Sequence, residues 1–347
     1  MIILRYAVIC AVQVTLAATP ATAQSAADTT SDSLAAIFRE HGVLPVTIVT
    51  DMRSLARDRR GEPEWQPAVL RFDGASGADS LSAEVRTRGI YRRAKCALPP
   101  LRIDVPRKRA ERTPFTGLNK FKLVVHCQNN DTYEQYVVQE YLLYRVYNLL
   151  TPFSQRARLL RMTYVDPSSQ KDSVTRYAIL LEEDENVARR TGTRLLDATG
   201  ARPDDLDSYH SALVGVFQYL IGNTDWSIPA LHNMKLLQSM TTNYPMAYDF
   251  DFSGAVSTRY ASVDPQLPIR SVRDRLFRGY CTTENKWQEV YELFRSQREA
   301  IKALYTDEPA LNARVRDRTL DYFDEFFAIL EHPERADRAF ARACRRS

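Results

Sequence analysis

Hydrophobic and polar residues alternate along several short segments in the first half of the chain. Five segments between residues 44 and 127, bounded by Pro, Gly, Asp and Asn, read LPVTIVTD, PAVLRFD, LSAEVRTRG, LPPLRIDV and NKFKLVVHC. A period of two with β-branched residues is typical of strands that are buried on one face. Two later segments, RLLRMTYVD and RYAILLEED, flank the polar turn DPSSQKD and predict a β-hairpin. The pattern therefore predicts an antiparallel, β-rich first half.

Helical spacing of the apolar residues follows the fifth segment. Asp131, with Glu134 three residues on, forms a capping-box pattern, and Pro152 ends the apolar run that comes after it. A second helix is predicted over residues 207–221, where Gly222 is suited to cap the C-terminal end. The last part of the chain contains ENKWQEVYELFRSQREAIKALY and PALNARVRDRTLDYFDEFFAILE, and both have the apolar spacing of long helices.

The order of these elements is strands, a helix, a strand hairpin, a helix, a short loop, a strand pair and then helices. This order is typical of the two-lobe α+β plan of protein kinases. We therefore expect a protein-kinase-like domain over residues 44–347. Its β-rich N-lobe with one helix would occupy about residues 44–183, and its mostly helical C-lobe about residues 184–347. Residues 24–43 are expected to form a polar leader and a short helix.

The first residues have the pattern of a targeting segment. Arg5 is the only charge before an apolar run, and the run ends at Ala21-Thr22-Ala23, a small-x-small cleavage site. The run is too short and too interrupted for a membrane anchor. We expect residues 1–23 to be a signal peptide, so that the mature protein is secreted or periplasmic and has no transmembrane segment.

The composition is ordinary for a globular protein and narrows the function only slightly. A chain of 347 residues can bury a sizeable core, and a net charge of +4 gives no reason to expect nucleic-acid binding. Four cysteines remain after cleavage, an even number that suits disulfides in an oxidising compartment. Three pairings are possible. We prefer Cys96 with Cys127, which flank neighbouring strand-like segments, and hence Cys281 with Cys344.

Polar side chains with metal and proton chemistry follow the second helix. Asp225 lies in a loop after this apolar helix, Asn233 opens an apolar strand eight residues later, and Asp249 and Asp251 end the next strand. Protein kinases place a base and two Mg²⁺ ligands with this spacing. We therefore predict that Asp225 is the base and that Asn233, Asp249 and Asp251 bind Mg²⁺ or Mn²⁺. The alternatives are a turn-forming aspartate and an ordinary acidic strand end.

A strand lysine and a helix glutamate could complete such a site. Alternation in NKFKLVVHC puts Lys120 and Lys122 on one face of the strand, and Lys122 lies deeper in it. Glu140 is the only acid in the middle of the next helix, where a buried carboxylate needs a cation. We predict that Lys122 binds nucleotide phosphates and pairs with Glu140, and that Lys120 is a second candidate. The alternative is a solvated lysine and a glutamate at the rim.

The segment VRTRGIYRRAK concentrates positive charge around one glycine. It could form a basic hairpin that covers phosphates, with Arg88 among the binding residues, or it could be a solvated turn. With a single glycine it does not match a Gly-rich phosphate loop.

Several of these segments together resemble the CotH-type kinases, atypical secreted kinases first known from spore-coat protein H. The resemblance covers roughly residues 81–281. Its most specific parts are GNTDWSIPALHN and YDFDFSG, and FTGLNKFKLVVHC, QEYLLYRVYNLL and YAILLEEDENVARR are weaker. It implies a kinase hinge at LLEED that holds adenine, with Glu182 in it. The resemblance implies that Asp225 acts in phosphoryl transfer. It implies that Asn233 and Asp249, with Asp251, bind metal, and that Lys122 forms the strand–helix ion pair with Glu140.

The expected function is therefore that of an exported, Mg²⁺-dependent atypical kinase. It would transfer phosphoryl from ATP to a protein Ser/Thr or to an envelope molecule. The Arg-rich, Gly-poor segment and the scarcity of ATP outside the cytoplasm leave open an alternative from another class. In that alternative the chain is a catalytically inactive, kinase-like binding module of the cell envelope.

Overall fold

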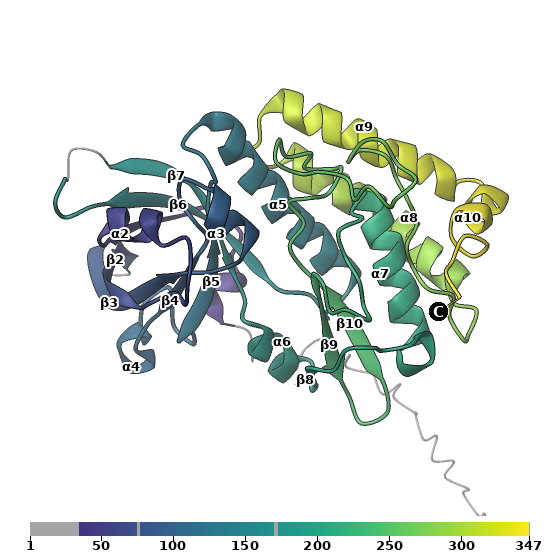
Figure 1. The fold of residues 1–347 in the computed structure, drawn as a ribbon, viewed down its shortest axis with the longest axis horizontal. Helices are drawn as coiled ribbons and strands as arrows, with labels where there is room; N and C mark the ends of the chain where they lie inside the picture. The colour runs from purple at the N-terminus through teal and green to yellow at the C-terminus, as the bar shows by residue number, and fades with distance from the viewer. Residues whose placement is uncertain (1–34, 75–76, 170–172, 347) are drawn as a thin grey trace, which may run out of the picture.

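A closed β-barrel lies beside a helical region in the computed structural model (Figure 1). The structure describes residues 35–74, 77–169 and 173–346, and the predicted signal peptide at residues 1–23 lies outside them. Within these residues the seven barrel strands match the seven predicted segments. Their bounds are β1 Leu44–Val49, β2 Gln66–Gly74, β3 Gly77–Thr87, β4 Leu101–Asp104, β5 Lys120–Val124, β6 Ala157–Val165 and β7 Val174–Leu181.

The barrel closes through one parallel pair of strands. Its strand order is β1-β2-β3-β4-β5-β7-β6, and β6 returns to β1, with Leu44 opposite Leu160 and Val49 opposite Val165. All other neighbours in the barrel are antiparallel. Closure removes both edges of the sheet. The prediction of a two-lobe protein-kinase fold with an antiparallel N-lobe is therefore wrong. Alternation identified the strands, but it contains no information about a partner that lies far along the chain.

The strands of the barrel divide their side chains between two hydrophobic cores. On β5, Phe121 and Leu123 belong to the buried core of the barrel, and Lys122 between them lies on the opposite face of the strand. Val124 at the end of β5, and Ile179 of β7, belong instead to the core of the helical region. One outer face of the barrel is thus fixed against the helices, and Lys122 lies at the boundary between the two cores.

Helix α5 (Asp131–Leu150) lies between the barrel and the other helices (Figure 1). Most of its 20 residues are buried, as expected for a helix with packing on all sides. Its N-cap is Asn130, whose side chain accepts a hydrogen bond from the Tyr133 amide at 3.2 Å. The cap thus lies one residue before the predicted Asp131. This helix carries Glu140 and Tyr144 toward the centre of the molecule.

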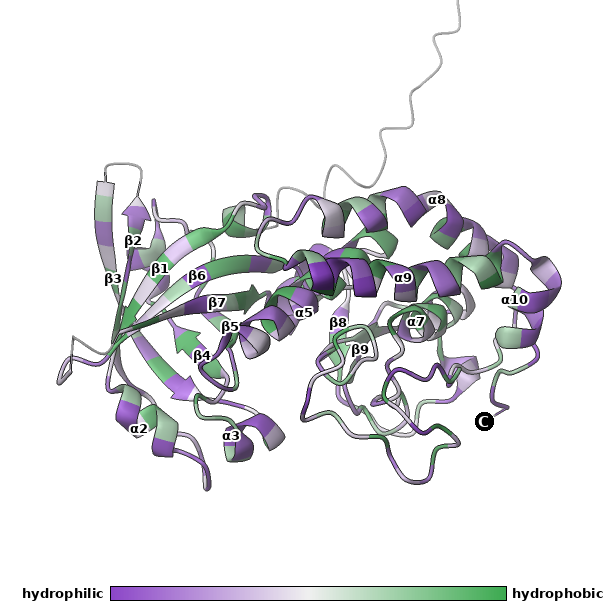
Figure 2. Cartoon of the chain, turned by 90° about the horizontal axis from the view of Figure 1, so that it is seen from above, coloured by the Kyte–Doolittle hydropathy of each residue, from purple (hydrophilic) through white to green (hydrophobic). Residues whose placement is uncertain are grey.

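The helical region also contains a small sheet, the three long helices α7, α8 and α9, and the shorter helix α10. Figure 2 shows hydrophobic and hydrophilic residues mixed along α8 and α9, as expected for helices with one buried face. The bounds are α7 Ser208–Ile221, α8 Trp287–Thr306, α9 Ala313–Leu330 and α10 Pro333–Ala339, with the antiparallel sheet β8 Arg194–Leu196, β9 Met234–Gln238 and β10 Asn243–Ala247. Short helices are η1 Ala36–Phe38, α2 Met52–Arg57, α3 Tyr91–Lys95, α4 Arg107–Ala110, α6 Asp184–Arg190 and η3 Pro203–Asp205.

Helix α7 ends at a position where only glycine fits. Asp207 caps its start by accepting a hydrogen bond from the His210 amide at 2.8 Å. Gly222 ends it at φ +63°, and a Cβ atom there would lie 2.0 Å from the Tyr322 hydroxyl. The chain therefore turns sharply at Gly222 and enters the loop that carries Asp225.

Two disulfides join the four cysteines of the described residues in the predicted pairs, Cys96 with Cys127 and Cys281 with Cys344. Such bonds persist in oxidising compartments, which fits the predicted export. Among the described residues, no helix is both long enough and apolar enough to span a membrane.

Candidate functional site

A cleft of about 640 Å³ lies where the barrel meets the helical region. Its walls come from β5, from α5, from the segment before α3, from the loop before β9 and from the segment after β10. Six of the predicted residues line it, namely Arg88, Lys122, Asp225, Asn233, Asp249 and Asp251. Lys120, Glu140 and Glu182 do not line it. The structure thus gathers most of the predicted site around one cavity.

The carboxylate of Asp225 is held by its own loop. His232 Nε2 lies 2.8 Å from one carboxylate oxygen, and Asn233 Nδ2 donates to the other at 3.0 Å. Asn233 Nδ2 also donates to the Asp225 carbonyl at 2.8 Å, and the Asp225 amide donates to Asn223 Oδ1 at 3.0 Å. A bridge between Ser227 and His232 closes the loop. Asp225 is therefore fixed in direction while its side chain remains 41% exposed.

Backbone strain is concentrated at this cleft. Leu231, Asn233 and Asp249 have φ values of +50°, +51° and +62°. Within the described ranges only Arg112 and Ser257 are other non-glycine residues with positive φ. A left-handed conformation costs such residues roughly 1–3 kcal/mol each, and it persists where the surrounding structure enforces it. Three strained residues around one cavity favour a functional role for that cavity.

Asp249 and Asp251 follow β10 and differ in their surroundings. The Asp249 amide donates to the Tyr144 hydroxyl of α5 at 3.0 Å, and its side chain faces the cleft. Asp251 is only 3% exposed and accepts a hydrogen bond from the Tyr260 hydroxyl at 2.9 Å. Burial, and then the nearby Asp249 carboxylate, raise the pKa of Asp251 to about 7. A cation near the pair would favour the ionised form of Asp251.

The cation nearest to Glu140 is Arg92 of α3. Arg92 Nη1 lies 3.8 Å from Glu140 Oε2 and also 3.8 Å from Asp251 Oδ2. Glu140 is 2% exposed, and its Oε1 has no hydrogen-bond partner among the described residues. Burial, and then the Asp251 carboxylate, raise the pKa of Glu140 well above its usual range. The sequence showed that Glu140 needs a cation but did not show which one.

Lys122 pairs with Asp184 rather than with Glu140. Its Nζ lies 2.8 Å from Asp184 Oδ1, in the first turn of α6, and Gln155 Nε2 donates to the same oxygen at 2.8 Å. The predicted Lys122–Glu140 pair is therefore wrong. Lys122 lies opposite Leu181 of β7, and the chain enters α6 directly after this strand, so α6 delivers the partner. Acidic residues in the first turn of a helix after a strand were the only sequence signal for Asp184.

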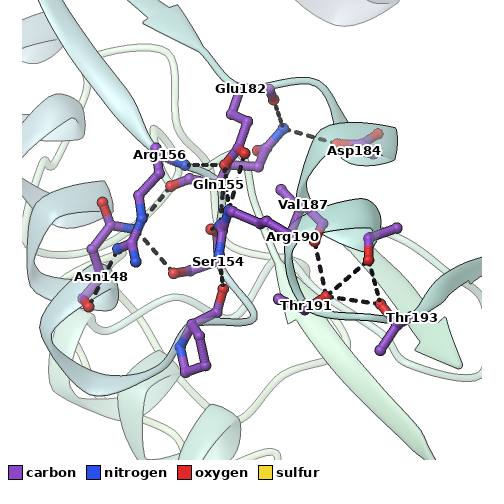
Figure 3. A network of polar contacts seen from close by, with 12 residues as sticks. Asn148, Ser154, Gln155, Arg156, Glu182, Asp184, Val187, Arg190, Thr191 and Thr193 are labelled. Atoms are coloured by element: carbon purple, nitrogen blue, oxygen red, sulfur yellow. Dashed lines mark hydrogen bonds and ion pairs between the residues drawn. The ribbon is translucent and has the colours of Figure 1, made fainter. Parts of the chain in front are cut away.

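Glu182 belongs to a buried polar network that fixes α6 to the barrel (Figure 3). Its carboxylate pairs with Arg190, whose Nε lies 3.0 Å away. Its backbone amide donates to the Arg156 carbonyl at 2.9 Å, and its own carbonyl accepts from Gln155 Nε2 at 2.9 Å. All of these groups are engaged within the protein. Glu182 is thus placed as a structural residue, and the neighbouring Leu181 lines the cleft instead.

The basic segment runs from the end of β3 toward its antiparallel neighbour β4, and its middle part lines the cleft. Its second half is the five-residue helix α3, in which Arg93 pairs with Asp58 and is buried. Arg88, before the helix, lines the cleft. Lys120 lies outside it, where its Nζ is 3.2 Å from Asp104 Oδ2 and its side chain is 44% exposed. Of the two strand lysines, only Lys122 reaches the site.

The cleft presents oxygen atoms of the kind that hard divalent cations prefer. Among the residues that the structure describes, no group of three or more His, Cys, Asp or Glu side chains is placed to hold a metal ion by itself. Mg²⁺ usually binds through one or two carboxylates plus substrate phosphates and water. Asp249 and Asp251 supply two carboxylates. Asn233 Nδ2 donates a hydrogen bond to Asp225, which leaves the side-chain oxygen of Asn233 as the atom suited to a metal.

No protein-family model and no curated protein matches the chain. The geometry of the cleft is therefore what bears on function.

Proposed function

We propose that the cleft binds a nucleotide such as ATP with Mg²⁺ or Mn²⁺ and transfers its terminal phosphoryl group to a hydroxyl of a protein or envelope substrate. One observation carries the proposal. A cation, a held carboxylate, an amide and two further carboxylates from separate elements converge on one cavity, and two of these residues are in strained conformations. One chemistry can occur on unrelated folds, so the residues of the cleft support this function without a kinase fold.

Phosphoryl transfer needs positioning and charge stabilisation more than covalent chemistry. A bound divalent cation would supply positive charge against the phosphate oxygens. Asp249, Asp251 and Asn233 would hold it through oxygen atoms. Lys122 would contact the phosphates, while Asp184 fixes the direction of its ammonium group at 2.8 Å. Arg88 would add positive charge at the wall of the cleft.

Asp225 would accept the proton of the acceptor hydroxyl. Its oxygens are oriented by His232 at 2.8 Å and by Asn233 at 3.0 Å. A base that is fixed within hydrogen-bond reach of its substrate typically contributes about 10²–10⁴-fold to the rate. Its partial exposure leaves room for a substrate to approach from the solvent.

Calorimetric titration of the mature chain with ATP, with and without Mg²⁺, tests the binding step. We expect binding that needs the metal, and we expect Asp249→Ala to abolish it. Asp321→Ala, at an exposed position of α9, is the matched control and should bind normally. Metal-dependent binding without any turnover would support the inactive binding module instead. No binding of Mg-ATP or Mn-ATP by folded wild type would refute the proposal.

A further inference from the structure

We infer that Arg92 is a positioning residue that holds Glu140 and Asp251 in place at the cleft, and that the Cys96–Cys127 disulfide fixes Arg92 there. The expected effect of Arg92 on metal binding rests on the proposed function, because Asp251 is one of the proposed metal ligands. Its structural part can be tested without nucleotide.

The guanidinium of Arg92 joins two acids from different parts of the chain. Its Nη1 lies 3.8 Å from Glu140 Oε2 of α5 and 3.8 Å from Asp251 Oδ2 after β10. The Arg92 side chain is 11% exposed, and the two carboxylate side chains are 2% and 5% exposed. Buried carboxylates repel one another unless a cation lies between them. Arg92 therefore stabilises an arrangement that the two acids alone would oppose.

The disulfide ties together the same two segments that Arg92 spans. Arg92 Nη2 donates to the Val125 carbonyl just after β5, and Cys127 follows two residues later. On the other side, the Cys96 amide ends α3 by donating to the Arg92 carbonyl at 2.8 Å. The Ala97 amide donates to the Cys127 carbonyl at 2.8 Å beside the bridge. A helix as short as α3 has little stability of its own, so this tether and the hydrogen bonds of Arg93 to the segment of residues 58–61 together determine where Arg92 lies.

A second contact from α3 reaches Asp251 independently. The ring of Tyr91 lies against those of Phe252 and Tyr260, with centroid distances of 5.6 and 6.3 Å. Tyr260 in turn donates its hydroxyl proton to Asp251 Oδ2 at 2.9 Å. Two neighbouring residues of α3 thus act on Asp251, one through charge and one through an aromatic cluster. Displacement of α3 would disturb both.

The first experiment compares Arg92→Met with Lys95→Met. Lys95 is the control because it is an exposed cation of the same short helix. We expect Arg92→Met to raise the Mg²⁺ concentration for half-saturation by about tenfold or more, with a smaller change in turnover at saturating metal. Arg92→Lys should recover part of the loss, and Lys95→Met should bind metal as wild type does. Equal effects of the two Met variants would overturn the inference.

The second experiment tests the tether and needs no nucleotide. The double variant Cys96→Ser/Cys127→Ser is compared with Cys281→Ser/Cys344→Ser, which removes the disulfide that does not involve α3 or β5. We expect the amides of residues 249–260 to exchange hydrogen faster in the first double variant and in Arg92→Met, but not in the second double variant. Unchanged exchange in Arg92→Met would overturn the positioning role. If wild type does not bind Mg-ATP while the exchange pattern holds, the proposed function fails and the positioning role stands.

Discussion

Replacement of Asp249 by glycine should stabilise the protein while it removes metal-dependent binding. Asp249 adopts φ +62°, a conformation that costs a non-glycine residue on the order of 1 kcal/mol. Glycine removes this strain, but it loses more conformational entropy on folding, which offsets about 0.5–1 kcal/mol of the gain. The net conformational effect is therefore close to zero, and the electrostatic effect decides the sign.

The electrostatic gain comes from the buried neighbour. Burial and then the Asp249 carboxylate raise the pKa of Asp251 from 3.8 to about 7, which corresponds to roughly 4 kcal/mol at neutral pH. Because the Asp249 carboxylate is the second cause of this shift after burial, its removal should recover a part of it, on the order of 1 kcal/mol. Because a raised carboxyl pKa lowers stability as pH rises from 3.8 to 7, the gain should be present at pH 8 and absent near pH 3.8.

Thermal unfolding in metal-free buffer measures this gain, and about 1 kcal/mol is roughly 2 °C for a chain of this size. Asp249→Asn is the matched control, because asparagine also tolerates a left-handed conformation and lacks the charge. Both variants should be more stable than wild type, and neither should show a Mg-ATP-dependent rise in unfolding temperature. A loss of stability in both would refute the reasoning about strain and charge. A normal rise with Mg-ATP would refute the metal assignment.

Three further changes test other parts of the account. Gly222→Ala should cost about 3 kcal/mol or more in unfolding free energy, because its Cβ would meet the Tyr322 hydroxyl at 2.0 Å and its φ is +63°; denaturant titration measures the loss. Lys122→Met should weaken Mg-ATP binding at least about tenfold in calorimetry, with the fold retained, because a charge-assisted phosphate contact is lost while Gln155 still binds Asp184. His210→Asn should reduce the loss of stability between pH 6.5 and 4. Burial lowers the pKa of His210 to about 4, so in this window the unfolded state binds a proton that the folded state does not, and the free energy of unfolding falls by up to roughly 3 kcal/mol. An unchanged pH profile would contradict this last prediction.

Local periodicity in the sequence was enough to place most of the elements. The predicted helix at residues 207–221 is found at Ser208–Ile221 with Asp207 as its cap, because apolar spacing and capping are properties of neighbouring residues. The disulfides followed from an even cysteine count and from two strand-like segments that were expected to be neighbours. The loop between Asp225 and Asn233 was also marked by nearby residues, and the structure joins the two by hydrogen bonds.

Long-range partners could not be read from such patterns. The parallel pairing of β1 with β6 closes the barrel and overturned the predicted fold, yet each strand has the same alternation in an open sheet. Helices α3 and α6 have five and seven residues, too few for a periodic signal, and tertiary contacts hold them. They carry Arg92 and Asp184, so the ion pairs of Glu140 and Lys122 were the part of the site that sequence reasoning assigned wrongly.

Transfer of label from γ-labelled ATP by wild type and by Asp225→Asn tests the central claim most directly. With Mg²⁺ present, wild type should pass label to itself, to an added protein or envelope substrate, or to water. Asp225→Asn should bind Mg-ATP with near-normal affinity, because the loop geometry remains. Its rate of label transfer should be lower by about 10²-fold or more, because the proton acceptor is lost. Equal transfer by both folded proteins, or no transfer by wild type that binds Mg-ATP, would contradict the account.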